Sequence, residues 1–404
     1  MKLLVLAPSF PDRQNRFYGG IFVKSQLEAL SKYVEEINVV TPIPISFGKL
    51  YEDKLCKNYS FDNVNVYFPR FLHLPLNYFR RRRGEREARV VYNLIEEKGI
   101  EFDLIHAHFA WPSGYASILL KQRFEVPVIV TTHGDDVRIP LTNYIQSFDN
   151  SFLKLRLDHV VNKADIILTH HEELRDLLLS SYPFFRNKIV FLYKGINLNR
   201  FNPFSENLQK KASSLKKSLG IENKFVILFL ARIDWDKGPL TFVEAAKLLR
   251  GNNEISLVMV GNGKLIKKCL ELKKKYSINN LYIIGGRSDT EIWYAMADVF
   301  VALSPIENIW STTLQEAFCM GLPSIVTNVG YSSKILKHMK DAFLIPPNNP
   351  KALVDAIFKL KTDESLIKQL SESALKWRKK FDNECIPKEI VRIYKDVTNH
   401  AINC

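Results

Sequence analysis

Short apolar runs alternate along the chain with stretches whose apolar residues repeat at the spacing of a helix. Runs of this kind, closed by glycine, proline or polar turns, are typical of buried parallel strands, and the stretches between them of crossover helices. In the N-terminal half the pattern predicts strands at Lys2–Ala7, Ile37–Thr41, Val64–Phe68, Leu104–Ala107, Val126–Thr131, Ala164–Thr169 and Lys188–Tyr193. In the C-terminal half it predicts strands at Phe225–Ala231, Ser256–Val260, Leu281–Gly286, Val299–Leu303, Ser324–Thr327 and Ala342–Ile345. The predicted fold class is therefore α/β.

The length of 404 residues is more than one compact core supports and fits two domains of about 200 residues each. The alternation of strand and helix starts again after Phe201–Pro203 without repeating the sequence, so this segment is predicted to be the linker. We place the first domain at residues 1–200 and the second at residues 201–380.

Composition narrows the class of protein further. Apolar residues make up 46% of the chain, and no apolar run reaches the ~18 residues that a membrane-spanning helix needs. The first apolar run ends at Pro8 and predicts a strand rather than a signal peptide. Five scattered cysteines without a Cys-x-x-Cys pair are typical of reduced thiols, not of a disulfide framework or a zinc site. These features predict a cytoplasmic protein.

The stretch Asp298–Gly330 is the most informative part of the chain. It contains a strand, a helix predicted at Ser311–Met320, and a second strand after Gly321 and Pro323. Ligands of parallel sheets bind beyond the carboxyl ends of the strands, and the start of a helix favours phosphate or hydroxyl groups. The candidate ligand contacts in this stretch are Glu307, Asn308, Thr312, Thr313, Leu314 and Glu316.

Other predicted strands also end in residues suited to binding. An arginine offers a planar fork to phosphate oxygens and a lysine a movable point charge, so Arg232 and Lys237 together can hold a diphosphate. Glycines at a strand-to-helix junction let phosphates approach the backbone closely. The remaining candidates are Gly19, Gly20, His108, His133, Gly261, Gly263 and Arg287.

Several of these motifs, in this order, resemble glycosyltransferase family 4, whose members are retaining enzymes with the GT-B architecture. Glu316–Pro323 fits the family pattern Glu-Ala-x-x-x-Gly-x-Pro. Asp103–His108 and Thr131–Asp136 resemble its Asp-x-Ile-His-x-His and Thr-x-His-Gly-x-Asp motifs. Arg232–Gly238 resembles its Arg-x-x-x-x-Lys-Gly loop, with Ala231 in place of the preceding glycine.

The sequence departs from the family pattern at three further places. The family has two glutamates eight residues apart; counting eight back from Glu316 reaches Asn308, and nine back reaches Glu307. Either residue can have the role of the first glutamate. Lys194 stands where the family usually has asparagine, and Lys334 where it often has glutamate.

The resemblance implies two Rossmann-like domains facing each other across a cleft, with the C-terminal helix, residues 381–404, packing back on the first domain. The first domain is expected to bind the acceptor and the second the nucleotide sugar. The implied activity is transfer of a sugar from a UDP- or GDP-sugar to an acceptor hydroxyl with retention of configuration and without a metal or other cofactor.

The resemblance also implies roles for the candidate residues. Arg232, Lys237 and the backbone at Gly19 and Gly20 are expected to face the diphosphate. Glu316 is expected to bind the ribose, Glu307 or Asn308 the sugar hydroxyls, and His133 the sugar near the reacting carbon. Gly261 and Gly263 are expected to lie under the nucleotide, and Arg287 beside the base.

The net charge of +14 indicates an acidic partner, and it is most concentrated at Arg80–Arg83. Arginines beside apolar and aromatic residues are typical of a segment at an anionic membrane surface. A loop packed on the domain, followed by a solvated basic helix, is the alternative. We expect a glycan or lipid-linked acceptor and no nucleic-acid partner, since no RNA- or DNA-binding motif is present.

Two other classes of protein remain open at this point. A non-catalytic relative would bind a sugar nucleotide, or act as a scaffold at a membrane, without transferring the sugar. A nucleic-acid-binding protein would show steeply salt-dependent affinity for oligonucleotides at the arginine run.

Overall fold

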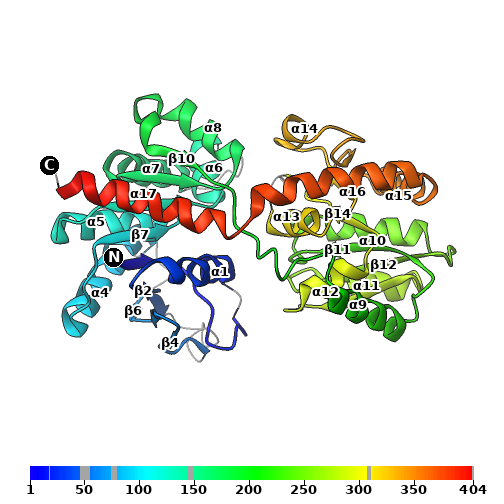
Figure 1. Cartoon of the computed structure of the whole chain (residues 1–404), viewed down its shortest axis with the longest axis horizontal. Helices are drawn as coiled ribbons and strands as arrows, with labels where there is room; N and C mark the ends of the chain where they lie inside the picture. The colour runs from blue at the N-terminus through cyan, green and yellow to red at the C-terminus, as the bar shows by residue number, and fades with distance from the viewer. Residues whose placement is uncertain (18, 46–54, 74–79, 143–148, 307–310, 403–404) are drawn as a thin grey trace. The chain divides into compact units, whose positions relative to one another are not determined.

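The computed structural model describes residues 1–17, 19–45, 55–73, 80–142, 149–306 and 311–402 (Figure 1). The chain divides into two compact units. The first consists of Met1–Gly195 with Asn383–Cys404, and the second of Ile196–Asp382. The junctions therefore fall at residues 195 and 382, against the predicted 200 and 380.

The first unit contains an eight-stranded sheet with the order β10-β9-β8-β7-β1-β2-β5-β4 among the described residues. Neighbouring strands are parallel except β4 and β5, and a separate parallel pair joins β3 to β6. The strands are β1 (Lys2–Leu6), β2 (Glu36–Val40), β3 (Ile43–Ile45), β4 (Tyr59–Phe61), β5 (Val64–Tyr67), β6 (Arg70–Leu72), β7 (Leu104–His108), β8 (Val128–Thr132), β9 (Ile166–Thr169) and β10 (Ile189–Phe191). The helices are α1 (Ile21–Leu30), α4 (Arg83–Lys98), α5 (Tyr115–Phe124), α6 (Asp135–Thr142), α7 (Asn150–Lys163), α8 (Glu172–Ser181) and α17 (Cys385–Ile402).

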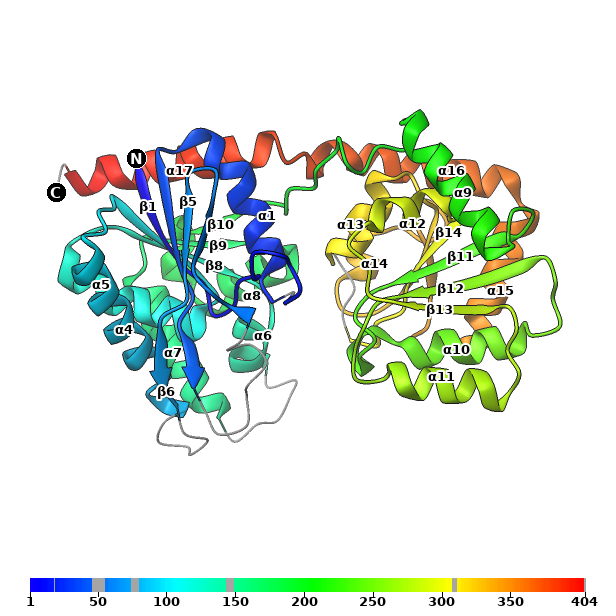
Figure 2. The same ribbon diagram turned by 90° about the horizontal axis from the view of Figure 1, so that it is seen from below.

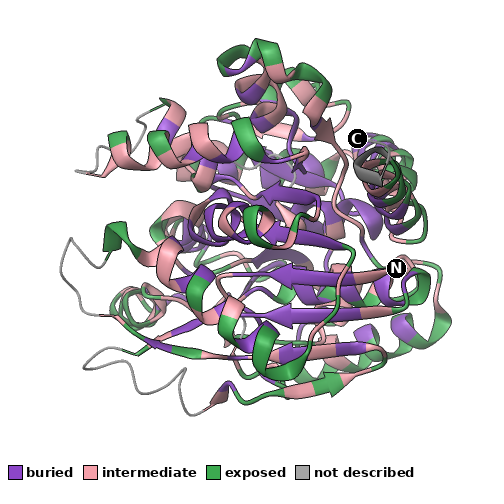
Figure 3. Ribbon diagram, turned by 90° about the vertical axis from the view of Figure 1, so that its left-hand side faces the viewer, coloured by how far each residue is buried: buried purple, intermediate pink, exposed green. Residues whose placement is uncertain are grey.

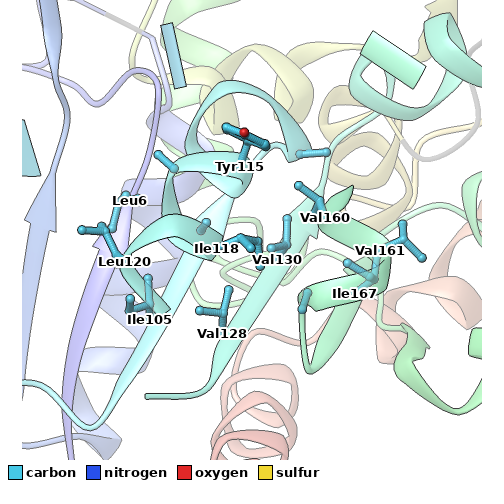
Figure 4. Close-up of a cluster of buried hydrophobic side chains, with 14 of the residues drawn as sticks. Leu6, Ile105, Tyr115, Ile118, Leu120, Val128, Val130, Val160, Val161 and Ile167 are labelled. Atoms are coloured by element: carbon cyan, nitrogen blue, oxygen red, sulfur yellow. The ribbon is translucent and has the colours of Figure 1, made fainter. Parts of the chain in front are cut away.

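Both faces of this sheet are covered by helices, which is why its strands read as nearly continuous apolar runs. The central strands are buried along most of their length (Figure 3). On one face, Leu6, Ile105 and Val130 share a core with residues of helices α4, α5 and α7. Figure 4 shows these three side chains with labelled residues of α5 and α7. Burying each such side chain contributes about 1.5–3 kcal/mol.

The C-terminal helix α17 belongs to the first unit, although the whole second unit precedes it in the sequence. Its buried residues Ile390 and Tyr394 join the core on the other face of the sheet, together with Leu3 and Val5 of β1 and Leu27 of α1. Among the described residues, no helix combines the length and apolar composition needed to cross a membrane.

The second unit has a six-stranded parallel sheet with the order β13-β12-β11-β14-β15-β16. Helices α10 and α11 lie on one face, and α9, α12 and α13 on the other (Figure 2). The strands are β11 (Phe225–Leu230), β12 (Ile255–Val260), β13 (Leu281–Gly285), β14 (Val299–Ala302), β15 (Ser324–Thr327) and β16 (Phe343–Ile345). The helices are α9 (Glu206–Leu219), α10 (Pro239–Leu248), α11 (Ile266–Lys275), α12 (Thr290–Met296), α13 (Thr312–Cys319), α14 (Ser332–Ile335), α15 (Pro350–Thr362) and α16 (Glu364–Arg378).

The strand order of the second unit is that of a Rossmann fold. The first three strands are added toward one edge of the sheet and the next three toward the other, so the order reverses between the first and fourth strands. The reversal here lies between β11 and β14. In open α/β sheets, such a reversal opens a crevice at the carboxyl ends of the two strands, where ligands bind. The equivalent reversal in the first unit lies between β1 and β7.

Candidate active site

The reversal point of the second unit brings several predicted residues together. A small cavity of about 20 Å³ lies there, lined by the ends of β11 and β14 and by Lys237, Ser311 and Thr313. Lys237 comes from the loop after β11, and Ser311 and Thr313 come from the start of α13. The predicted cation of the phosphate loop and the predicted helix start are therefore neighbours in space.

Two aspartates hold the loop after β11 in shape. The guanidinium of Arg232 donates to Oδ2 of Asp234 and to Oδ2 of Asp236, both at 2.9 Å, and Nζ of Lys237 lies 3.2 Å from Asp236. Asp234 also accepts from the backbone N–H of Lys264 at 2.8 Å. The Arg232 side chain is 65% exposed, so its charge is presented at the surface. Among the described residues, no group of three or more His, Cys, Asp or Glu side chains is arranged to hold a metal ion.

Glycines let neighbouring strand ends approach this loop closely. Gly261 has φ of +145°, and a Cβ there would lie 1.9 Å from the carbonyl oxygen of Ala231. A Cβ on Gly263 would lie 2.5 Å from the carbonyl oxygen of Ile233. The structure therefore gives both glycines a role in packing the loop after β11.

Helix α13 is one residue shorter at each end than predicted, because Ser311 caps it rather than belonging to it. The Oγ of Ser311 accepts from the N–H of Leu314 at 3.4 Å, so this N–H is already partnered. Thr312 and Thr313 form the rest of the first turn, where N–H groups have no acceptor within the helix. Glu307 and Asn308 lie outside the described residues.

Glu316 lies on α13 beside a buried tyrosine of α12. The hydroxyl of Tyr294 is 2.9 Å from Oε2 of Glu316 and 3.0 Å from the carbonyl oxygen of Thr313. Burial raises the pKa of Glu316 to about 7, against the opposing effects of Tyr294 and of the cation of Arg200. The carboxyl group therefore changes its charge near neutral pH.

Tyr294 and Arg200 were not predicted from the sequence. Arg200 donates to Glu291 at 2.8 Å and to the carbonyl oxygen of Ser288. In the sequence, Tyr294 stands in an amphipathic segment, which predicts only a core position. Arg200 lies 116 residues before Glu316 and belongs to no motif. Arg287 itself forms a two-pronged ion pair with Asp289, at 2.9 and 2.7 Å.

In the first unit, the loop after β1 ends in the predicted glycine pair. Gly20 has φ of +73°, and a Cβ there would lie 2.2 Å from the carbonyl oxygen of Ser9. Helix α1 begins at the next residue. Asp12 fixes the loop by accepting from the N–H of Phe17 at 2.7 Å. Only glycine suits position 20, since other side chains would meet both strain and a clash.

His133 follows β8 and is held by the loop that it begins. Its N–H and that of Gly134 donate to Oδ1 of Asp136, at 3.0 and 2.9 Å, and the N–H of Ala110 donates to Oδ2 at 2.9 Å. The imidazole packs against Phe22 of α1 and against Phe109, with ring centroids 4.8 and 4.5 Å away. Burial, with the nearby His108 and Lys194, places the pKa of His133 well below its usual value, so the ring is neutral at pH 7.

Two family models match the chain. One, described as Glycosyl transferases group 1, covers residues 211–377, and the other, described as Glycosyltransferase Family 4, covers residues 47–200. Among curated proteins, the chain is 26% identical over 370 residues to a putative teichuronic acid biosynthesis glycosyltransferase of Bacillus subtilis, covering 88% of each chain. It is also 26% identical over 294 residues to an Escherichia coli UDP-Gal:alpha-D-GlcNAc-diphosphoundecaprenol alpha-1,3-galactosyltransferase, covering 70% of this chain and 72% of that protein.

Among solved structures, the chain resembles Anabaena HepE, crystallised in complex with UDP, with a TM-score of 0.74 and 17% identity over 98% of this chain and 100% of that one. With its two Rossmann-like units, the protein is a glycosyltransferase of the GT-B fold class. It belongs to the group 1 glycosyltransferases of family 4. The resemblance stated from the sequence motifs is thus confirmed.

Proposed function

We propose that this glycosyltransferase moves a sugar from a nucleoside-diphosphate sugar to an acceptor hydroxyl with retention of anomeric configuration and without a metal ion. The observation that carries the proposal is the Rossmann reversal point of the second unit, where Lys237 of the Arg232–Lys237 loop and the start of α13 line one cavity. A UDP complex of Anabaena HepE supports a nucleotide-bound donor, and UDP- and GDP-sugars are the donors that we consider.

The second unit binds the donor in this proposal. Arg232 and Lys237 neutralise the diphosphate, and the first turn of α13 donates its N–H groups to phosphate or sugar oxygens. Glu316 accepts hydrogen bonds from the ribose. Glu307 or Asn308 binds the sugar hydroxyls, and Arg287 contacts the base.

Transfer requires the charge that develops on the leaving diphosphate to be neutralised. Cations already fixed beside the phosphates do this at little reorganisation cost, an effect often worth several kcal/mol. Asp234 and Asp236 are the partners of Arg232 in the structure, and in this proposal the phosphates take their place. Departure of the diphosphate and attack by the acceptor on the same face of the sugar would keep the configuration.

The first unit binds the acceptor in this proposal. Gly19, Gly20 and the start of α1 face the diphosphate, and His133 contacts the sugar near the reacting carbon. The acceptor is a glycan or a lipid-linked glycan. The name of the E. coli relative, which states a diphosphoundecaprenol acceptor, supports this class of acceptor.

Binding and slow hydrolysis across a panel of UDP- and GDP-sugars test the proposed function. We expect one donor to raise the thermal midpoint of the protein and to release free nucleotide slowly. Stabilisation by a donor, with neither hydrolysis of that donor nor transfer of its sugar to any acceptor, would favour a non-catalytic relative. If no donor binds, the proposed function is wrong.

Donor binding is expected to strengthen as the pH rises through about 7, the pKa of Glu316. Below this pH the carboxyl group is protonated. One of its oxygens then carries a hydrogen, so the group no longer accepts hydrogen bonds from both ribose hydroxyls. Above it the carboxylate accepts from both. Of the groups around it, Arg200 and Glu291 form an ion pair with each other, and Tyr294 stays neutral because burial raises its pKa.

Calorimetric titration with a sugar nucleotide between about pH 5.5 and 8.5 measures this dependence. An intact sugar nucleotide is the suitable ligand, because its diphosphate diester does not change charge in that range. The matched control is Glu316→Gln, for which we expect weaker binding that no longer changes with pH. An equal pH dependence in both proteins would contradict the assignment of Glu316.

We also propose that the protein is cytoplasmic and associates peripherally with the membrane through its arginine run. Arg83 is turned inward, because its guanidinium donates to the buried Glu87 at 2.8 Å. Arg80, Arg81 and Arg82 are exposed. Leu72 is exposed, and its backbone carbonyl oxygen accepts a hydrogen bond from the guanidinium of Arg86 at 2.5 Å. This bond places Leu72 close to the start of α4, where the arginine run ends. An exposed leucine near outward arginines suits an anionic lipid surface.

Replacing Arg80, Arg81 and Arg82 together by alanine is expected to weaken binding to anionic vesicles by about 100-fold, since each basic residue near the surface contributes about 1 kcal/mol. Sedimentation with phosphatidylglycerol vesicles measures this. The charge-matched control replaces three exposed lysines of α11, at positions 267, 268 and 274, by alanine. Equal weakening by both triple changes would mean that net charge alone, rather than this segment, drives binding.

A further inference from the structure

Three histidines of the first unit lie side by side at the carboxyl ends of β7 and β8. His106 and His108 share one face of β7, and their ring centroids are 4.6 Å apart. The Nδ1 atom of His108 lies 3.0 Å from the Nε2 atom of His133, which follows β8. His106 and His108 are fully buried, whereas His133 keeps part of its surface exposed.

The contact between His108 and His133 has the geometry of a hydrogen bond in the plane of the rings. The ring planes differ by 22°, and the centroids are 5.2 Å apart. The distance between the centroids is longer than the distance between Nδ1 of His108 and Nε2 of His133 by about one ring radius for each ring. Both nitrogens therefore lie close to the line that joins the two centroids. A face-to-face stack would instead have brought the centroids as close as the atoms.

Two neighbours of this pair, His106 and His170, have ordinary structural hydrogen-bond partners. His106 bonds through Nδ1 to the hydroxyl of Tyr394 at 2.5 Å and through Nε2 to Oγ1 of Thr131 at 2.7 Å. His170 bonds through Nδ1 to the carbonyl oxygen of Leu192 at 2.8 Å. These bonds explain why two neutral imidazoles can be buried at these positions.

His108 and His133 differ, because each has a second buried ring nitrogen with no hydrogen-bond partner among the described residues. These atoms are Nε2 of His108 and Nδ1 of His133. A buried polar atom without a partner is costly and therefore needs an explanation. A ligand that binds next to His133 supplies one.

The count of hydrogens limits the pair to two arrangements. Both rings are neutral, because burial lowers the pKa of each far below its usual value. Two neutral imidazoles carry two N–H hydrogens, and one of them lies in the shared bond. The other is therefore on one of the two unpartnered nitrogens, either Nε2 of His108 or Nδ1 of His133.

Both unpartnered nitrogens are buried as atoms, but the rings that carry them differ in exposure: the ring of His108 is fully buried, whereas the ring of His133 keeps part of its surface exposed. A buried N–H without an acceptor is rarer than a buried acceptor without a donor. Nε2 of His108, in a ring with no exposed surface, is therefore assigned as the nitrogen without hydrogen, and the hydrogen is placed on Nδ1 of His133, whose ring borders the surface where a ligand can supply the acceptor. His108 then donates from Nδ1 to Nε2 of His133.

We propose that His108 is a positioning residue that holds His133 in the Nδ1–H tautomer, so that His133 offers a hydrogen-bond donor to an oxygen of the bound sugar. This inference rests on the proposed function for the identity of the ligand. The tautomer of His133 itself depends only on the first unit. His108 acts through His133 and needs no contact with the substrate.

Nuclear magnetic resonance of the full chain, labelled with ¹⁵N-histidine, tests the tautomer without any substrate. Two-bond ¹H–¹⁵N spectra distinguish protonated from bare ring nitrogens. We expect His133 to be protonated at Nδ1, His108 to be protonated at Nδ1, and a coupling across the bond from Nδ1 of His108 to Nε2 of His133. His170→Asn is the control, which should leave the His133 pattern unchanged. Protonation of His133 at Nε2 in the unsubstituted protein would overturn the proposal.

A matched pair of substitutions tests the role in transfer. Asparagine and aspartate have the same shape. The amide nitrogen of asparagine lies where Nδ1 of histidine does, and it can donate a hydrogen bond. An aspartate carboxylate can only accept one. We expect His108→Asn to keep the His133 tautomer and most of the turnover. His108→Asp should move the hydrogen of His133 to Nε2 and lower kcat/KM by about tenfold or more relative to His108→Asn. Equal activity of the two variants, both folded by thermal unfolding, would overturn the positioning role.

The outcome for the proposed function is separate. If no sugar nucleotide is turned over by the unsubstituted protein, the proposed function fails and with it the role of His108 in transfer. The spectrum still decides the tautomer of His133 in that case.

Discussion

Replacing Arg232 or Lys237 by alanine is expected to lower the turnover of the sugar nucleotide by about 100- to 1,000-fold each. Both cations lie on the loop after β11, and Lys237 lines the cavity at the reversal point of the sheet. In the proposed reaction they neutralise charge that grows as the diphosphate leaves. Their loss should therefore lower kcat more than it raises KM.

Steady-state kinetics with the donor from the panel measure this effect. Arg250→Ala is the matched control, because Arg250 is exposed in the same unit but lies at the end of α10, away from the loop. Arg232→Lys keeps the positive charge but loses the planar fork of the guanidinium. Its turnover should therefore fall between that of the unsubstituted enzyme and that of Arg232→Ala. Turnover within about twofold of the unsubstituted enzyme for both alanine variants, a difference of under 1 kcal/mol, would contradict the diphosphate assignment.

Gly261→Ala is expected to lower the thermal midpoint of the protein by roughly 5–10 °C and to abolish donor binding. The new Cβ would lie 1.9 Å from the carbonyl oxygen of Ala231, and φ of +145° is strained for alanine. Strain and overpacking of this kind cost about 2–4 kcal/mol. A unit of this size shifts by roughly 2–4 °C for each kcal/mol. The same contact would displace the backbone just before Arg232.

Differential scanning calorimetry and donor titration measure the two parts of this prediction. The control is Gly251→Ala, because a Cβ on Gly251 meets nothing within 4 Å. We expect that change to leave both quantities unaltered. A Gly261→Ala protein with unchanged midpoint and donor affinity would show that the close approach to Ala231 is not needed.

The strands of both sheets could be predicted closely because both faces of each sheet are covered. A strand buried on both faces is a nearly continuous apolar run, and Ser324–Thr327 is observed with the predicted bounds as β15. The short pair β3 and β6 and the antiparallel strand β4 were not predicted, since each contains a proline or a polar residue and therefore forms no continuous apolar run. Helix α9 was not predicted either, because its face is largely polar and only Leu208 and Ala212 are buried.

The positions of the candidate residues could be read from motifs, but their partners could not. The bond between His108 and His133 joins residues 25 apart, and that between Tyr294 and Glu316 joins residues 22 apart. Such contacts depend on the sheet order, which no local pattern specifies. The paired aspartates Asp234 and Asp236 were visible in the sequence, yet their bonds to Arg232 appear only in the folded loop.

The anomeric configuration of the product tests the central proposal most directly. The donor found in the panel is turned over with an excess of chelator, and proton nuclear magnetic resonance records the transferred or released sugar before it can mutarotate. The account predicts the same anomeric configuration as in the donor, and a rate that the chelator does not change. An inverted product, or turnover that stops with chelator and returns with a divalent cation, would contradict it.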